Sequence, residues 1–154
     1  MASAAVRALI ARIEAAFPDA PPPPFDRRLD NLVPEDAAVF RRTRWRAIVS
    51  DKLPYDAVFF FSDRQLRYYL PAYLVAALRW PRRAAKGNLH RALVGSLVAP
   101  RRNDPDRAAF FARMDPLALE QKRVVRACLW QFAAEFPGDP EAPRALRRYW
   151  DQYE

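Results

Sequence analysis

The chain of 154 residues is long enough for one domain with a buried core, and its 51% hydrophobic content excludes global disorder. Its 26 Lys and Arg against 18 Asp and Glu give a net charge of +8, which favours an acidic partner, either a protein or a nucleic acid. No segment approaches the roughly 18 consecutive apolar residues of a membrane span, and a single cysteine excludes an intrachain disulfide. Arg7, Arg12 and Glu14 interrupt what would be the apolar part of a secretory signal. We therefore expect a cytoplasmic protein without a membrane segment.

The first part of the chain is expected to be one amphipathic helix followed by a stiff connection. Ser3 can cap a helix within residues 1–17, and Pro18 ends it because the residue before a proline is pushed out of the helical region. The connection spans residues 18–33 and contains Pro21–Pro24, which favours polyproline II. It acts either as a spacer, which is the simpler interpretation, or as a docking ligand for an aromatic groove. The face expected to be buried comprises Val6, Leu9, Ile10, Ile13 and Phe17.

The body of the domain is expected to span residues 34–154, and it opens with a helix that has Pro34 in its first turn. The run that follows places four arginines around Trp45. Cations interleaved with an aromatic can bind single-stranded nucleic acid by stacking and phosphate contacts. The alternative is that Trp45 belongs to the core while the arginines form a solvated face. Three of these cations are candidates for partner binding: Arg41, Arg42 and Arg44.

A central helix is predicted within the stretch from Phe59 to Trp80. Ser62 and Gln65 have the spacing of a capping box, and Val58–Phe61 is expected to be an extended lead into the helix. Pro71 lies inside the helical pattern, where it lacks an N–H group, so we expect a kink there. The core-facing stripe comprises Leu66, Tyr69, Leu70, Tyr73, Leu74, Ala77 and Leu78.

Two sets of residues around this helix are candidates for contact with a partner. Arg67 and Tyr68 lie off the apolar stripe, so they are expected to face outward. Beyond the helix, residues 79–102 carry seven cations and no acid, partly in a predicted basic loop after Trp80. The candidates from this second set are Arg79, Arg82, Arg83 and Lys86.

The C-terminal half is expected to continue as helices. A short helix is predicted for Leu89–Val98, with Asn88 as its N-cap. Asp-Pro pairs at residues 104, 115 and 139 predict three further helix starts, and the second of these would begin the most regular helix. The sequence therefore predicts an all-α, single-domain, irregular bundle of about six helices around a proline-kinked central helix.

Residues that carry out catalysis are scarce. His90 is the single histidine, and three glycines cannot build a phosphate-binding loop. Cys128 lies on the apolar side of a predicted helix and is expected to be an inert, buried thiol, although a Cys–His pair with His90 is a geometric alternative. We predict no catalytic residue, no metal ligand and no cofactor. A carboxylate-based enzyme leaves no signature in a single sequence and stays a third alternative.

Several segments together resemble a small bacterial family of unknown function that is recognised by a YLPAYL-type motif. The distinctive element lies in FSDRQLRYYLPAYLVAAL, residues Phe61–Leu78. Further matching pieces are IEAAF (Ile13–Phe17), the spacing of Phe40 and Trp45, LEQKRVVRACLWQF (Leu119–Phe132) and RYW (Arg148–Trp150). The resemblance covers most of the chain and implies a small cytosolic bacterial protein, with no established activity and no role for any residue. Proteins of this kind often stand beside toxin genes as immunity partners, which is an association and not a physical argument.

We therefore expect a non-enzymatic protein-binding domain. Its most natural role is that of an immunity or antitoxin-like inhibitor that docks on an acidic protein partner, such as a cognate toxin. The alternative is a basic nucleic-acid-binding module that uses residues 41–46 and 79–102. The sequence predicts no oligomeric state.

Overall fold

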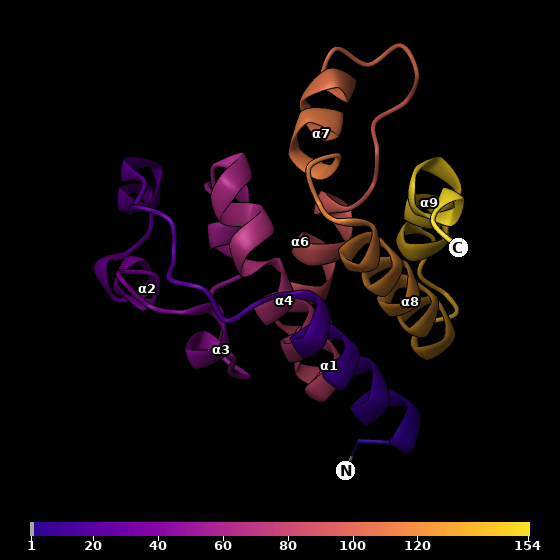
Figure 1. Ribbon diagram of the computed structural model, residues 1–154, viewed down its shortest axis with the longest axis horizontal. Helices are drawn as coiled ribbons and strands as arrows, with labels where there is room; N and C mark the ends of the chain where they lie inside the picture. Colours follow the sequence, from indigo (N-terminus) through magenta and orange to yellow (C-terminus); the bar gives the residue numbers. More distant parts are fainter. Residues whose placement is uncertain (1) are drawn as a thin grey trace.

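The computed structural model describes residues 2–154, so Met1, the first residue of the predicted N-terminal segment, lies outside it. Within this range the chain forms nine α-helices and three short 3-10 turns, and no strand (Figure 1). The helices are α1 (Ala4–Ala16), α2 (Pro34–Val39), α3 (Trp45–Ile48), α4 (Asp63–Arg79), α5 (Pro81–Lys86), α6 (Leu89–Ser96), α7 (Arg107–Met114), α8 (Leu119–Glu135) and α9 (Glu141–Arg148). The 3-10 turns are η1 (Arg27–Asn31), η2 (Asp56–Phe59) and η3 (Trp150–Gln152).

Helix α4 lies at the centre of the fold. Twelve of its 17 residues are buried, and it contacts α1, α3, α5, α6, α7 and α8. The predicted capping box is present: the Gln65 N–H donates to the Ser62 hydroxyl (3.2 Å), and the Ser62 N–H donates to the Gln65 side chain (3.4 Å). Pro71 lies inside α4, which continues past it to Arg79; the kink stays a prediction. The central position of this helix makes it the support for every surface described below.

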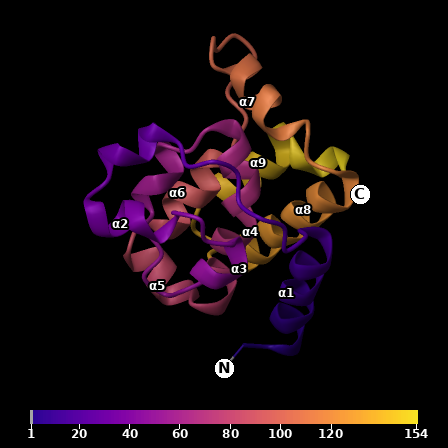
Figure 2. The ribbon, with the colours of Figure 1, turned by 60° about the vertical axis from the view of Figure 1, so that its left-hand side comes forward.

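Helix α1 packs against α8 and α4 (Figures 1 and 2). It begins at the predicted cap, where the Val6 N–H donates to the Ser3 hydroxyl (3.2 Å). The apolar face expected from the sequence is buried, including Phe17 just beyond the helix. From there an extended segment with the prolines leads to η1, with no regular structure in between.

Two predictions near α4 are wrong. The lead at Val58–Phe61 is not extended, because residues 56–59 form η2, which packs on α6. The residues after Trp80 are not a loop but helix α5, with Pro81 in its first position. Proline is favoured at that position, because an N–H group there would have no partner inside the helix. The loop was predicted from the basic composition of the segment, which outweighed this signal.

A third prediction is wrong in the C-terminal half. The longest helix after α4 does not start at Asp115-Pro116, because Asp115 is the last residue capping α7 and its carboxylate accepts a hydrogen bond from the Tyr149 hydroxyl (2.6 Å). Helix α8 starts at Leu119 instead, where the Gln121 side chain accepts from the Ala118 N–H (2.9 Å). The all-α, single-domain prediction is confirmed, with nine helices in the described residues where about six were expected. None of these helices is both long and apolar enough to span a bilayer.

Candidate partner-binding surface

The turn between α4 and α5 presents four cations, Arg79, Arg82, Arg83 and Lys86, which we call the basic corner. All four are exposed. The turn is held by backbone hydrogen bonds, since the Trp80 N–H donates to the Ala76 carbonyl and the Ala84 N–H donates to the Trp80 carbonyl, both at 2.9 Å. The cations therefore extend from helical backbone and not from a loose loop.

The charge of the basic corner is only partly neutralised. Arg83 forms an ion pair with Asp51. No acidic group of residues 2–154 pairs with Arg79, Arg82 or Lys86, and the chain has no acid at all from residue 64 to residue 103. Exposed cations without nearby acids produce a positive potential that attracts an anionic surface.

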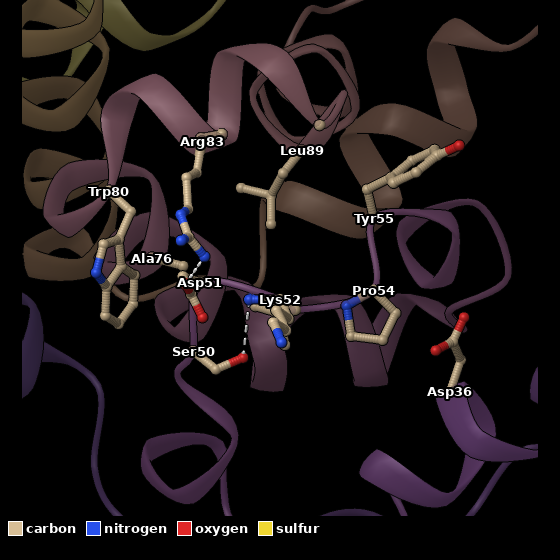
Figure 3. A pocket seen from close by; sticks show the side chains of 13 residues that line it. Asp36, Ser50, Asp51, Lys52, Pro54, Tyr55, Ala76, Trp80, Arg83 and Leu89 are labelled. Atoms are coloured by element: carbon tan, nitrogen blue, oxygen red, sulfur yellow. Dashed lines mark hydrogen bonds and ion pairs between the residues drawn. The ribbon is translucent and has the colours of Figure 1, made fainter.

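A cavity of about 270 Å³ opens beside the basic corner (Figure 3). Arg83 reaches across its rim to Asp51, while the Trp80 and Tyr55 rings lie at opposite sides of the view. The Ser50 hydroxyl accepts from the Lys52 N–H (3.2 Å), which shapes the loop that forms one wall. The lining residues are Asp36, Ser50, Asp51, Lys52, Leu53, Pro54, Tyr55, Ala76, Trp80, Arg83, Ala84, Gly87 and Leu89.

Two exposed aromatic side chains in the segment that leads into α4 were not among the predicted candidates. Tyr55 is 37% exposed and lines the cavity, and Phe59, at the end of η2, is 69% exposed. Phe59 belongs to a run of three phenylalanines, of which only Phe61 is fully buried. The 3-10 geometry of η2 decides which ring points outward, and the sequence pattern contains no sign of that turn.

The basic run of residues 41–46 differs from the basic corner, because its central residues form hydrogen bonds to the N-terminal segment of the chain. Trp45 is 2% exposed, and its indole N–H donates to the Pro18 carbonyl (3.1 Å). Arg44 donates to the Asp19 carbonyl (2.5 Å), and Arg46 to the Glu14 carbonyl (2.7 Å). A buried Trp45 cannot stack on a nucleic-acid base, so the core interpretation of this residue is confirmed.

The first two arginines of the run lie next to the polyproline segment. The Arg41 guanidinium lies 4.0 Å from the Phe25 ring centroid and 3.4 Å from the Asp30 carboxylate. Arg42 is exposed and has a φ of 51°, a left-handed conformation that is uncommon for a residue with a side chain. Both line an open hollow of about 750 Å³ with Pro22–Phe25.

Arg67 and Tyr68, the two candidates on α4, contact the chain itself. Arg67 donates to the Arg113 carbonyl (2.8 Å), which ties α4 to α7. The Tyr68 hydroxyl donates to the Ala20 carbonyl (2.6 Å) and accepts from the Trp45 N–H (3.3 Å), and burial raises the pKa of Tyr68. Both residues border a second cavity of about 260 Å³ beneath the N-terminal segment.

The nine candidate residues therefore do not form one surface. Tyr68 and Arg79 are eleven residues apart on α4, about 17 Å along the helix axis. The basic segment of residues 79–102 is divided too, because the loop that leads into α7 lies at the top of Figure 2 and helix α5 at the lower left. Arg101 and Arg102 belong to that loop. Among the candidate groups in residues 2–154, the basic corner combines three cations that lack an ion pair with an adjoining cavity, whereas the hollow near the polyproline segment is lined by one such cation, Arg42.

The groups with catalytic potential lie elsewhere. Cys128 is buried in the core, where burial raises its thiol pKa, so the thiolate is disfavoured. The His90 Nε2 lies 3.0 Å from a carboxylate oxygen of Asp139, and its ring packs against Phe132 and Phe136. Residues 2–154 contain no group of three or more His, Cys, Asp or Glu side chains placed to hold a metal ion. The described cavities beside the basic corner and under the N-terminal segment include neither His90 nor Cys128.

The fold and this surface define a basic, all-helical protein with an exposed cationic corner beside a small cavity. A model of the family described as "Family of unknown function (DUF6714)" matches residues 25–154, and the chain belongs to that family. The predicted membership of a family of unknown function is confirmed, whereas the YLPAYL segment as its hallmark stays a prediction. Helix α1 and the four prolines precede the matched range. No curated protein matches the chain, and no solved structure does.

Proposed function

We propose that this protein is a non-enzymatic binding protein that docks its basic corner on an acidic protein partner. The observation that carries the proposal is the group of exposed cations on helical backbone, where Arg79, Arg82 and Lys86 have no acidic partner in residues 2–154. Because the backbone of α4 and α5 is already helical, only the side chains of these cations have to be ordered on binding, which favours specific contacts over diffuse attraction.

An immunity or antitoxin-like inhibitor is the role that we propose within this class. Such an inhibitor needs a stable body and a charged surface, and it needs no chemistry of its own. A core that extends from α1 to η3 provides the body, and the basic corner provides the surface. We place its action in the cytoplasm, in line with the single cysteine.

The first basic run, residues 41–46, lacks the exposed aromatic face that binding of nucleic acid would use there, which supports a protein partner over nucleic acid. Binding of a single strand relies on aromatic faces that stack on bases, next to cations that contact phosphates. The aromatic residue of the first basic run, Trp45, is buried. Arg44 and Arg46 donate to backbone carbonyls of the N-terminal segment, which reduces their availability for phosphate.

Paired charge reversals test this proposal. The corner variant carries Arg82→Glu with Lys86→Glu, and the matched loop variant carries Arg101→Glu with Arg102→Glu in the loop between α6 and α7. All four residues are exposed, so both variants should fold, and both change the net charge equally. Proteins that bind the immobilised full chain are identified from an extract of the source bacterium and then purified. The corner variant should slow association with the partner roughly tenfold or more, and the loop variant should change it much less.

Oligonucleotides are the second arm of the experiment. Non-specific binding to DNA or RNA should disappear by about 0.2 M salt, with a steep linear fall of log K against log salt. Sub-micromolar binding to one oligonucleotide over scrambled controls at physiological salt would favour the nucleic-acid alternative. Equal effects of the two reversals on a protein partner would remove the basic corner from the proposal.

A further inference from the structure

We propose that the cavity beside the basic corner receives one large apolar side chain from an acidic segment of the partner. This inference rests on the proposed function and specifies the chemistry that the partner must bring. The segment carries Asp or Glu on one side of a residue such as Leu, Phe or Trp. The apolar side chain enters the cavity, and the flanking carboxylates bind the cations of α5.

The size and lining of the cavity fit a side chain better than a cofactor. Its volume of about 270 Å³ is smaller than the roughly 300–1,000 Å³ of sites that enclose drug-sized ligands. The wall is mixed: charged and polar groups from the 36, 50–52 and 83 positions form the rim, and apolar side chains from the 50–55 loop, α4, α5 and α6 form the rest. The apolar lining residues are Leu53, Pro54, Ala76, Trp80, Ala84 and Leu89.

The helical geometry of α5 places unpaired cations next to the cavity. Arg83 and Gly87 line the cavity, and they are four residues apart on one face. Arg82 and Lys86 form the neighbouring row, about 100° around the same helix, and both are exposed. A segment whose apolar side chain enters the cavity therefore has its next residues beside these two cations.

The acidic residues of the cavity give the segment a preferred direction. Asp36 lies across the cavity from Arg83, and Asp51 is held by Arg83 on the loop side (Figure 3). Carboxylates of the partner are repelled from Asp36 and attracted to Arg82 and Lys86, so the acidic flank follows α5. On the other side, the half-exposed Tyr55 ring provides apolar contact area of the kind that anchors interfaces.

A displayed library of random peptides, selected on the immobilised full chain, tests the inference without knowledge of the partner. We expect the selected peptides to share acidic residues on one side of one large apolar residue, and to bind the corner variant at least about tenfold more weakly. The decisive pair is Ala84→Leu, which fills the cavity, and Ala85→Leu, which adds the same side chain to the exposed neighbouring position.

Ala84→Leu should weaken the selected peptides about tenfold or more, because the partner's apolar side chain loses its site, while Ala85→Leu should leave them unchanged. Thermal unfolding checks that both variants fold. Tyr55→Ala, an exposed position, gives a second test in which peptide affinity should also fall.

The possible failures of the two proposals differ. If peptides distinguish the wild type from the corner variant but bind Ala84→Leu and Tyr55→Ala as tightly as the wild type, the cavity inference is wrong and the proposed function stands. Selected peptides that share acids without an apolar residue lead to the same conclusion. If no peptide distinguishes the wild type from the corner variant, both proposals are contradicted.

Discussion

The basic run of residues 41–46 and the basic corner after Trp80 have similar sequences, with arginines grouped beside a tryptophan, and different surroundings. In the first, Trp45, Arg44 and Arg46 all donate to carbonyls of residues 14–19. In the second, the neighbouring backbone is helical, and three of the four cations have no acidic partner in residues 2–154.

The difference follows from the backbone beside each group. The extended segment after α1 forms no regular hydrogen bonds of its own, and carbonyls near a core need donors from elsewhere. Arg44 and Trp45 supply these donors, and Arg46 donates to the Glu14 carbonyl in the last turn of α1. In and around α5, backbone N–H groups bind the carbonyls of Trp80 and Arg83, and the cations of the corner remain available for a partner. The number of arginines in a segment therefore says less about binding than the hydrogen-bonding needs of its neighbours.

The largest expected difference between the two regions is in the free energy of unfolding that is lost when the tryptophan of each is replaced. Trp45→Ala should lower the free energy of unfolding by about 3–5 kcal/mol, because it empties a fully buried site and leaves the Pro18 carbonyl without its donor. Trp80→Ala should cost less than half as much, since Trp80 is only partly buried. Urea denaturation of both variants gives the two values. Equal losses would mean that the two regions are equally structural.

A smaller effect is expected for the arginines themselves. Arg44→Ala with Arg46→Ala should cost about 1–2 kcal/mol through two lost hydrogen bonds to backbone, and should expose the segment around residues 18–25 to proteases. Arg79→Ala with Arg82→Ala should change stability by less than about 0.5 kcal/mol. Urea midpoints and limited proteolysis measure both. A stability loss at the corner as large as at the first run would contradict the division of roles.

Local signals in the sequence were sufficient for much of the helical framework. The caps at Ser3 and Ser62 depend on residues three positions apart, and their hydrogen bonds form as predicted. The apolar stripes of α1 and α4 depend on helical period alone, and they are buried. These features need no knowledge of distant contacts, which is why one sequence could specify them.

The missed helix α5 had a local signal in Pro81, whereas other features were missed because a distant residue decides the outcome. Asp115 was expected to start a helix, but its carboxylate binds the Tyr149 hydroxyl, 34 residues away. Tyr68 as a partner contact stays a prediction, but the hydrogen bond of its hydroxyl to the Ala20 carbonyl was not foreseen. Backbone acceptors have no sequence signature, so no periodicity could have indicated these pairs. The cavity beside α5 brings together residues from 36 to 89 and was invisible for the same reason.

The pH dependence of stability at alkaline pH gives a further test of the first basic run, through Tyr69 of α4. The Tyr69 hydroxyl lies 3.0 Å from the carbonyl oxygens of Phe40 and Thr43, beside the first basic run, and burial raises the pKa of Tyr69 to about 12. Above about pH 10 the unfolded tyrosine loses its proton while the folded one keeps it, so the free energy of unfolding falls as pH rises from 10 towards 12.

In Tyr69→Phe this contribution is absent. Its stability profile should therefore be shallower than that of the wild type by about 1 kcal/mol between roughly pH 10 and 11. The other tyrosines are present in both proteins, so they largely cancel in the difference. Urea unfolding at several pH values measures the two slopes, and parallel profiles would show that Tyr69 keeps an ordinary environment.

The smallest expected effect concerns the backbone of the first basic run. Arg42 has a φ of 51°, a conformation that costs a residue with a Cβ atom about 1 kcal/mol and costs glycine almost nothing. Arg42→Gly relieves this strain, but glycine also gives the unfolded chain more freedom, which offsets part of the gain. We expect a net stabilisation of about 0.5 kcal/mol, measured as a higher urea midpoint.

Arg91→Gly is the control, because Arg91 is an exposed position inside α6 and glycine there should cost about 1 kcal/mol. If Arg42→Gly destabilises the protein as much as Arg91→Gly, the Arg42 side chain contributes to the fold beyond its backbone conformation, and the first basic run is structural over its whole length.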